Sequence, residues 1–243
     1  MSAPVTVRGV VLAGGSGQRL RPLTLTTNKH LLPVGSKPMI YYPIERLVEA
    51  GITEIAVVTG VEHIGDIVSH LRSGERFGCA FTYFVQEEPS GIAHALSLTR
   101  HFTAGERFVT VLGDNIFFAP LRPQLDAWLA SGLGARVLLK QVPDPQRFGV
   151  ARFEGERLVE VLEKPSDPPS DYAVTGIYFY DASAYDVAAT LTPSARGEYE
   201  IADVNNDYIR RGQLGYGVLE GAWSDAGTHA SLARAQRLVA ERE

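Results

Sequence analysis

The glycine-rich segment 12–20, LAGGSGQRL, contains the residue types in this chain best suited to chemistry. It follows an apolar run over residues 9–12, GVVL, which predicts a buried strand. Glycines at the end of a strand let the backbone turn sharply, and they leave N–H groups free to bind anionic oxygen atoms. Arg19 lies within the segment and Lys29 follows soon after it, so two cations accompany the turn. The segment therefore predicts a triphosphate site.

Two better-known glycine-rich motifs do not fit this segment. A dinucleotide fingerprint requires a third glycine where the chain has Leu20, and an acidic residue after the next strand, which here ends in Thr59 and Gly60. A Walker A loop requires Gly-Lys-Ser or Gly-Lys-Thr, and the sequence contains neither. The pattern thus argues against a dehydrogenase. A glycine turn used only for close packing remains the alternative to a triphosphate site.

Two aspartates are candidate ligands for Mg²⁺. Asp114 directly follows the apolar run 108–112, and ligands of open α/β sheets bind at the carboxyl ends of strands. Mg²⁺ is usually held by one or two carboxylates together with substrate phosphates. Asp225 is the second candidate. Each has a structural alternative, because Asp114 could cap a turn with Asn115, and Asp225 could be the N-cap of the last helix.

Other charged or metal-binding residue types give weaker indications. Lys164 and Arg196 lie in the second half of the chain, and each taken alone is typical of a solvated surface cation. The histidines do not have the spacing of a zinc site, and neither HExxH nor CxxC occurs. The single cysteine, Cys79, excludes an intrachain disulfide, and we interpret it as a small buried thiol beside a strand rather than as a nucleophile.

The elements that must position these residues alternate between strands and helices. Strands are predicted over 55–59, 81–85, 108–112 and 136–142, and helices around 40–48, 64–71, 91–101 and 121–129. This alternation predicts an α/β fold of Rossmann-like type, with a mixed, mostly parallel central sheet and helices on both faces. A hairpin over 150–162 and a long strand over 173–180 then predict an inserted β-rich part. An apolar stripe (Leu232, Ala235, Leu238 and Val239) predicts a final helix whose stripe is covered by its own core or by a partner.

Size and charge limit the class of protein. The 243 residues fit a single domain over 1–243, with a nucleotide-binding part at about 1–120 and a substrate-binding part at about 121–243. The net charge of −5 argues against a nucleic-acid partner. No apolar run reaches the length of a membrane span, and residues 1–8 do not have the pattern of a secretory leader. We therefore expect no membrane association and a cytoplasmic location.

Taken together, the motifs resemble those of the sugar-phosphate nucleotidylyltransferases, and within them the glucose-1-phosphate thymidylyltransferases. The match extends over nearly the whole chain. It includes the segments 12–17, 37–43, 112–117, 163–165, 173–176, 194–198 and 223–229, together with Lys29. The resemblance implies transfer of a nucleotidyl group from dTTP to glucose 1-phosphate, giving dTDP-glucose and pyrophosphate with Mg²⁺ as cofactor. UTP, another hexose 1-phosphate, or a catalytically silent nucleotide-sugar-binding regulator are the alternatives.

The resemblance also implies a role for each site residue. Nucleotide binding falls to Leu12, Gly14, Gly15, Gln86, Pro89 and Gly91. Catalytic contacts to phosphates fall to Arg19, Lys29 and Lys164, and metal binding to Asp114 and Asp225. Sugar-phosphate binding falls to Asn115, Gly149, Glu163, Val174, Tyr178 and Arg196, which makes 121–243 the sugar-binding part. The amide of Gln86 would accept from N3–H and donate to O4 of thymine or uracil.

The chain departs from the family pattern at a few positions. Gln is common where this chain has His30 and His94, and Thr where it has Gln18. Because His30 is next to Lys29, we expect it to touch phosphate and to alter the pH dependence. The family's compact thymidylyltransferases continue beyond Glu243 with an extension that helps to form a tetramer and a feedback site. We therefore expect a homodimer with weak or no feedback inhibition.

Overall fold

The computed structural model describes residues 6–242. Residues 1–5, which belong to the segment examined for a leader, and Glu243, at the end of the predicted final helix, lie outside the described residues.

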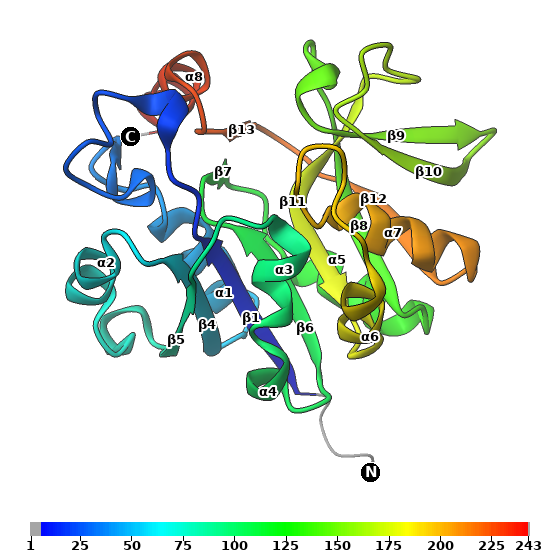
Figure 1. Cartoon of the computed structure of the whole chain (residues 1–243), viewed down its shortest axis with the longest axis horizontal. Coiled ribbons are helices and arrows are strands. Elements are labelled where there is room, and N and C mark those ends of the chain that lie inside the picture. The colour runs from blue at the N-terminus through cyan, green and yellow to red at the C-terminus, as the bar shows by residue number, and fades with distance from the viewer. Residues whose placement is uncertain (1–5, 243) are drawn as a thin grey trace.

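A sheet of nine strands runs through the described part of the chain (Figure 1). Its main path has the order β10-β9-β11-β6-β1-β4-β5, and β8 pairs with both β11 and β12. The strands are β1 (Val7–Ala13), β4 (Glu54–Gly60), β5 (Ala80–Gln86), β6 (Arg107–Leu112), β8 (Ala135–Gln141), β9 (Gly149–Glu154), β10 (Arg157–Glu163), β11 (Tyr172–Tyr180) and β12 (Leu214–Val218). β6, β1, β4 and β5 are mutually parallel, whereas β11 is antiparallel to β6 and β8.

Helices cover both faces of the sheet because apolar side chains alternate along its strands. In β1, Val11 and Ala13 face one core, while Val10 and Leu12 face another. The first core is completed by α1 (Tyr41–Glu49), α2 (Ile64–Leu71) and α5 (Arg122–Ser131). The second is completed by α3 (Ile92–Ser97), α6 (Ser183–Thr190) and α7 (Ile201–Arg210). The predicted fold class is confirmed. One sheet passes through both expected parts, and their boundary near residue 120 stays a prediction.

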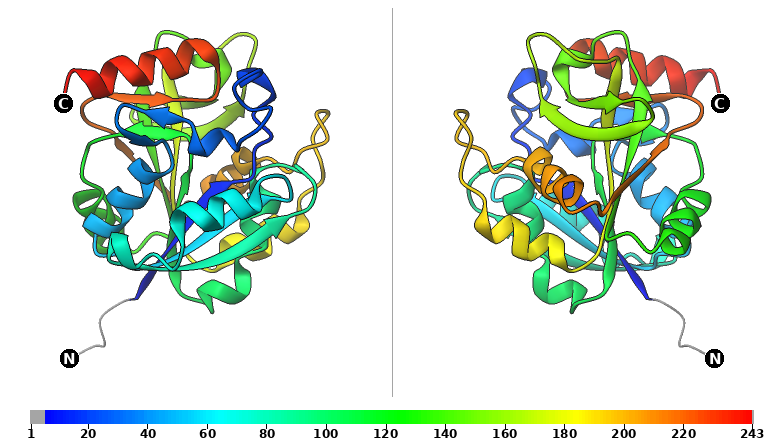
Figure 2. Two further views of the ribbon diagram at one scale, coloured as in Figure 1. Left: turned by 90° about the vertical axis from the view of Figure 1, so that its left-hand side faces the viewer. Right: turned by 90° about the vertical axis from the view of Figure 1, so that its right-hand side faces the viewer.

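The last helix, α8 (His229–Ala240), packs on its own chain at one end of the molecule (Figure 2). Ala235 and Val239 are buried in a third core with Leu20, Met39 and Tyr42. The intrachain core therefore covers the buried part of the predicted stripe. Thr228 is the N-cap of this helix and forms a capping box with Ser231, so the alternative role of Asp225 as its N-cap is wrong.

Short elements complete the framework. β7 (Asn115–Phe117) pairs with β13 (Trp223–Asp225), and β2 (Pro33–Val34) pairs with β3 (Lys37–Pro38). The 3₁₀ turns are η1 (Gln18–Leu20), η2 (Lys29–Leu31), η3 (Glu75–Phe77) and η4 (Pro145–Arg147). The β7–β13 pair, which the sequence analysis did not predict, places Asp225 opposite Asn115 and thus beside Asp114.

The predicted helix over 91–101 is wrong in one respect. The segment forms two helices, α3 and the short α4 (Arg100–Thr103), separated at residues 98 and 99. The Thr99 hydroxyl lies 2.8 Å from the Leu96 carbonyl oxygen, to which it donates. Such local side-chain bonding competes with the helical backbone pattern, which explains the break.

A bulge in β11 opens the sheet where the predicted site residues gather. Residues 177–180 of β11 pair with β6, whereas Ala173 pairs with Val150 of β9. The register shifts between Val174 and Tyr178, where Gly176 has a φ of 75°. A bulge bends its strand and re-aims the neighbouring side chains. The bend therefore leaves space beyond the end of β6.

Candidate active site

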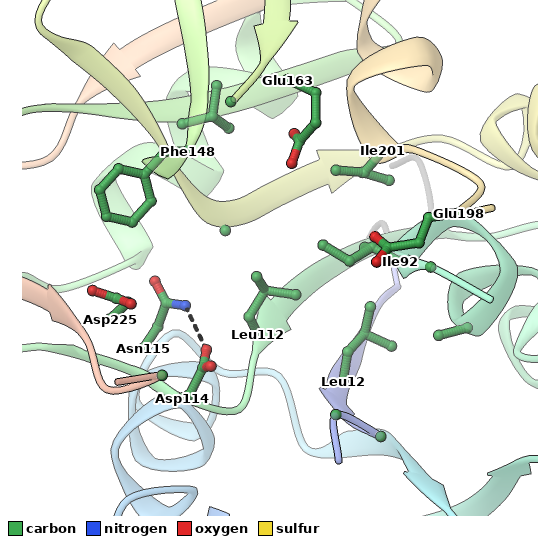
Figure 3. Close-up of a pocket in the computed structure, with 18 of the residues that line it drawn as sticks. Leu12, Ile92, Leu112, Asp114, Asn115, Phe148, Glu163, Glu198, Ile201 and Asp225 are labelled. Atoms are coloured by element: carbon green, nitrogen blue, oxygen red, sulfur yellow. Dashed lines mark hydrogen bonds between the residues drawn. The ribbon is translucent and has the colours of Figure 1, made fainter. Parts of the chain in front are cut away.

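One cavity of about 560 Å³ lies at the carboxyl ends of β1 and β6, bounded on the far side by β9–β11 and α7 (Figure 3). The structure brings nearly all the predicted site residues to its wall. These are Leu12, Gly14, Gly15, Arg19, Lys29, Gln86, Pro89, Gly91, Asp114, Asn115, Gly149, Glu163, Lys164, Val174, Tyr178 and Asp225. Arg196 is the exception among the predicted residues, because it is not part of the wall.

The glycine segment lets Lys29 approach the turn closely. A Cβ atom on Gly15 would lie 3.1 Å from Lys29 Cε, and one on Gly17 would lie 3.0 Å from Lys29 Cβ. Gly17 also has a φ of 64°, which disfavours other residues, and its carbonyl oxygen accepts from the Thr24 hydroxyl at 2.8 Å. The glycines thus allow a lysine ammonium group to lie against a backbone turn.

Asp114 and Lys29 form an ion pair in the cavity wall. Lys29 Nζ lies 2.5 Å from Asp114 Oδ2, and only 12% and 13% of the two side chains are exposed. Burial alone would raise the pKa of the Asp114 carboxyl group, but the charges of Lys29 and Arg19 and the hydrogen bond from Lys29 lower it to about 2. Asp114 is therefore ionised at neutral pH.

Asp225 is held by Arg147, a cavity residue that the sequence analysis missed. Arg147 Nη2 lies 2.9 Å from Asp225 Oδ2, while Arg147 Nη1 lies 2.8 Å from Asp144 Oδ2. Burial and the charge of Asp114 raise the pKa of the Asp225 carboxyl group, and Arg147 opposes them. The sequence offered one signal, since Arg147 stands two positions before the predicted site residue Gly149.

The two aspartates fit the requirements of a divalent cation. A Cβ atom on Gly227 would lie 3.4 Å from Asp225 Oδ2, 3.5 Å from Asp114 Oδ2 and 3.3 Å from Arg19 Nη2, so these groups converge. Asp225 Oδ1 is buried and has no hydrogen-bond partner, which leaves one carboxylate oxygen free for a ligand. Within residues 6–242, no group of three or more His, Cys, Asp or Glu side chains could hold a metal ion by itself. Two carboxylates suit Mg²⁺ that also takes phosphate oxygens as ligands.

Gln86 is fixed by contacts within the chain. Its Nε2 donates to the Gly91 carbonyl oxygen at 3.1 Å and lies 2.9 Å from His94 Nδ1. Its Oε1 would lie 3.0 Å from a Cβ atom on Gly14. Both N–H groups are thus directed at protein atoms, and the amide oxygen is the group left for a ligand. The expected donation from Gln86 to O4 of the base would require the amide to give up one of these contacts.

His30 does not supply charge to the site. Its side chain is 1% exposed, and its Nδ1 lies 2.7 Å from Asn28 Oδ1. Burial, and then the charge of Lys29, lower its pKa to about 3. The imidazole is therefore neutral at neutral pH. His30 lines the cavity, so the expected contact with phosphate stays a prediction, but a neutral imidazole would add no positive charge there.

At the opposite end of the cavity, Glu163 lies among cations. Lys164 Nζ and Arg196 Nη2 lie 3.2 Å and 3.3 Å from Glu163 Oε1. Arg196 also contacts Glu200 at 2.8 Å and Glu198 at 3.3 Å, and these carboxylates account for its place outside the wall. Carboxylates contact Nε and Nη2 of Arg196, so a phosphate would have to bind at Nη1 or displace one of them.

Asn115 lies between Asp114 and β13 in the wall. Its Oδ1 accepts from Trp223 Nε1 at 2.7 Å, and its Nδ2 donates to Asp114 Oδ1 at 3.4 Å, as Figure 3 shows for the second contact. Both polar atoms of the side chain are therefore used within the protein.

Comparison with known proteins assigns this arrangement to a family. The model of the nucleotidyl transferase family matches residues 8–242. The chain belongs to this family. It is 46% identical to a glucose-1-phosphate thymidylyltransferase of Neisseria meningitidis over 237 residues, which cover 96% of this chain and 82% of the relative. A relative of the same description from Mycolicibacterium smegmatis is 41% identical, with the same coverage.

Solved structures agree with this assignment. A structure described as a glucose-1-phosphate thymidylyltransferase of Bacillus anthracis, in complex with sucrose, has a TM-score of 0.92 and 51% identity. The similarity covers 96% of this chain and 95% of that one. A UDP-glucose pyrophosphorylase bound to UDP-glucose has a TM-score of 0.86 at 23% identity and shows a shared fold. The predicted resemblance is confirmed, and the chain is a nucleotidyltransferase. Among residues 6–242, no helix has both the length and the apolar character needed to cross a bilayer.

Proposed function

We propose that the chain transfers a thymidylyl group from dTTP to glucose 1-phosphate, forming dTDP-glucose and pyrophosphate. One observation carries the proposal: a single cavity joins a glycine turn bearing Arg19 and Lys29 to the Glu163–Lys164 wall, with two aspartates between them. The names of the relatives support this choice of substrates.

The reaction needs no nucleophile from the protein. An anionic oxygen of the sugar 1-phosphate attacks the α-phosphorus of dTTP, and the bond from that phosphorus to the bridging oxygen of pyrophosphate breaks. Arg19 and Lys29 hold the triphosphate and the departing pyrophosphate, while Lys164 and Arg196 hold the sugar phosphate. Catalysis then rests on alignment and on neutralising charge between two polyanions.

Asp114 and Asp225 would hold Mg²⁺ in this proposal. When bound, the ion would neutralise phosphate charge and orient the α-phosphate. The free Asp225 Oδ1 supports this role, and so does the low pKa of Asp114, because a ligand carboxylate must be ionised.

Base choice is proposed to rest on Gln86 Oε1. An amide oxygen accepts from the N3–H of thymine or uracil but meets an acceptor, N3, in cytosine. UTP therefore remains the near alternative, as does another hexose 1-phosphate. A silent regulator is disfavoured because Arg19, Lys29, Asp114, Lys164, Arg196 and Asp225 are all present.

A homodimer located in the cytoplasm completes the proposal. Since one face of α8 packs on its own chain, a dimer would not use that buried face.

The test is a panel of nucleoside triphosphates against sugar 1-phosphates, scored by pyrophosphate release with and without Mg²⁺. We expect the highest kcat/KM for dTTP with glucose 1-phosphate. If no pair of substrates releases pyrophosphate, the catalytically silent regulator becomes the favoured function. A higher kcat/KM for UTP than for dTTP would make UTP the substrate.

A further inference from the structure

One amide in the cavity wall has a role that the reaction described above does not use. Asn205 lies on α7 and is 0% exposed, yet it lines the cavity with Ile201 and Ala202 of the same helix. Figure 3 shows Ile201 near Glu163, on the side of the cavity opposite Asp225. This wall thus borders Glu163, a residue assigned to the sugar.

The two polar atoms of Asn205 differ in their partners. Oδ1 accepts from the Tyr180 hydroxyl at 2.5 Å. Nδ2 is buried and has no hydrogen-bond partner. A buried donor without a partner is costly, and native proteins leave few of them, so an acceptor from outside the chain is expected.

The surroundings of Asn205 identify the kind of acceptor. The ring of Tyr180 stacks on the ring of Tyr178, with an angle of 7° between the two ring planes. Tyr178 in turn lines the cavity. No Lys or Arg of the described residues bonds to Asn205, whereas the phosphate positions are marked by Lys29 and Lys164. A neutral N–H between tyrosines and aliphatic side chains suits a neutral oxygen, as in a hydroxyl group.

We infer that Asn205 determines sugar specificity by donating from Nδ2 to one hydroxyl oxygen of the hexose. This inference rests on the proposed function, because it assigns a residue to the sugar of that reaction. The enzyme should then reject a sugar lacking that hydroxyl, since the Asn205 donor would again be buried without a partner.

The experiment compares glucose 1-phosphate with analogues that each lack one hydroxyl group, using kcat/KM for pyrophosphate release. For the wild-type chain, we expect a roughly tenfold to hundredfold loss with one particular analogue. In Asn205→Leu, which removes the donor and keeps the volume, glucose 1-phosphate should lose a similar factor. For the analogue that the wild-type chain uses poorly, kcat/KM should be almost the same in Asn205→Leu as in the wild-type chain.

Tyr180→Phe is the matched control. It removes the other hydrogen bond of Asn205 while leaving Nδ2, so it should retain the wild-type order among the analogues. Circular dichroism and thermal melting establish that both variants fold.

Three results would overturn the inference: equal use of all analogues by the wild-type chain, an equal loss for every sugar in Asn205→Leu, or the Asn205→Leu pattern in Tyr180→Phe. The second and third would indicate that Asn205 supports the wall or holds a water molecule. The first needs no variant, so it decides the matter even if Asn205→Leu does not fold. Absence of activity with every sugar 1-phosphate would instead contradict the proposed function.

Discussion

The two candidate metal ligands are each held by one cation, Asp114 by Lys29 and Asp225 by Arg147. Lys29 lowers the pKa of the Asp114 carboxyl group against the effect of burial, whereas Arg147 only opposes the burial and the charge of Asp114 that raise the pKa of Asp225. The pairs also fix which oxygen is occupied, because Arg147 contacts Oδ2 of Asp225 and leaves Oδ1 without a partner. The two candidate metal ligands are therefore held in place by contacts within the chain itself.

Replacing either aspartate should remove this arrangement. We expect Asp114→Asn and Asp225→Asn to lower kcat by roughly a hundredfold or more, because a neutral amide neutralises less metal charge in the transition state. Asp126→Asn, which changes an exposed pair with Arg122, is the matched control. Steady-state rates at limiting Mg²⁺ provide the measurement. Near wild-type turnover in either variant would remove that residue from the metal site.

Gln86→Ala should weaken recognition of the base. The loss of one buried hydrogen bond is worth about 1–3 kcal/mol, so the KM for dTTP should rise roughly tenfold to a hundredfold, and discrimination against other bases should decrease. Competition between nucleoside triphosphates measures both effects. If the order of preferred nucleotides stays the same, Gln86 does not contact the base.

His30 predicts an acid-sensitive fold. Its pKa is about 3 in the folded protein and near 6.5 when unfolded, so the unfolded chain binds a proton first as the pH falls. The stability associated with neutral His30 is therefore complete above about pH 6.5 and is lost progressively toward pH 3. Tm measured from pH 7.5 to 4.5 should fall more steeply for the wild-type chain than for His30→Gln. Parallel curves would show that His30 is not the group responsible.

At the scale of elements, the bend in β11 is the feature that opens the cavity. Gly176 permits the bend because it adopts a positive φ and has no Cβ atom. A Cβ atom at this position would lie only 2.7 Å from Leu112 Cδ1. The bend separates the stretch that pairs with β6 from the stretch that pairs with β9.

Gly176→Ala should therefore destabilise the fold by two effects. Left-handed backbone costs about 1–2 kcal/mol for a residue with a Cβ, and overpacking costs about 1–3 kcal/mol more. Gly155→Ala is the control, because Gly155 also has a positive φ of 62° but nothing within 4 Å of its Cβ position. Urea denaturation should give a larger loss for Gly176→Ala. Equal losses would mean that the contact with Leu112 is not important.

Regular periodicity explains which elements could be predicted from the sequence. The strands of the first half and the hairpin over 150–162 correspond to observed elements, since their apolar patterns and turn residues are local. The break at Thr99 and the β7–β13 pair depend on contacts that the pattern does not show. Arg147 meets Asp225 from 78 positions away, so no local spacing could identify it. Arg196 was a predicted site residue, but its three carboxylate partners depend on how the surrounding loop folds.

At the scale of the whole molecule, α8 belongs to the core of its own subunit. Ala235 and Val239 are 0% and 2% exposed without any partner chain. The proposed dimer and the stability of α8 should therefore be separable.

Val239→Asp tests this separation. A carboxylate in this core should cost at least about 2 kcal/mol, which lowers Tm, while the molecular mass of the folded fraction stays that of a dimer. Light scattering and thermal melting supply the two readouts. A mass reduced to that of a monomer, with Tm unchanged, would place α8 at the subunit interface instead.

The packing of α8 also bears on how the protein is made. Leu20, beside Arg19 in the glycine segment, is buried against Ala235 and Val239, and His229 Nε2 lies 2.9 Å from the Arg21 carbonyl oxygen, 208 positions earlier. A ribosome synthesises the glycine segment first and the helix that covers it much later. A nascent chain therefore carries the glycine segment without its α8 cover through most of translation, and we expect the segment to reach its final packing only after α8 has emerged and docked.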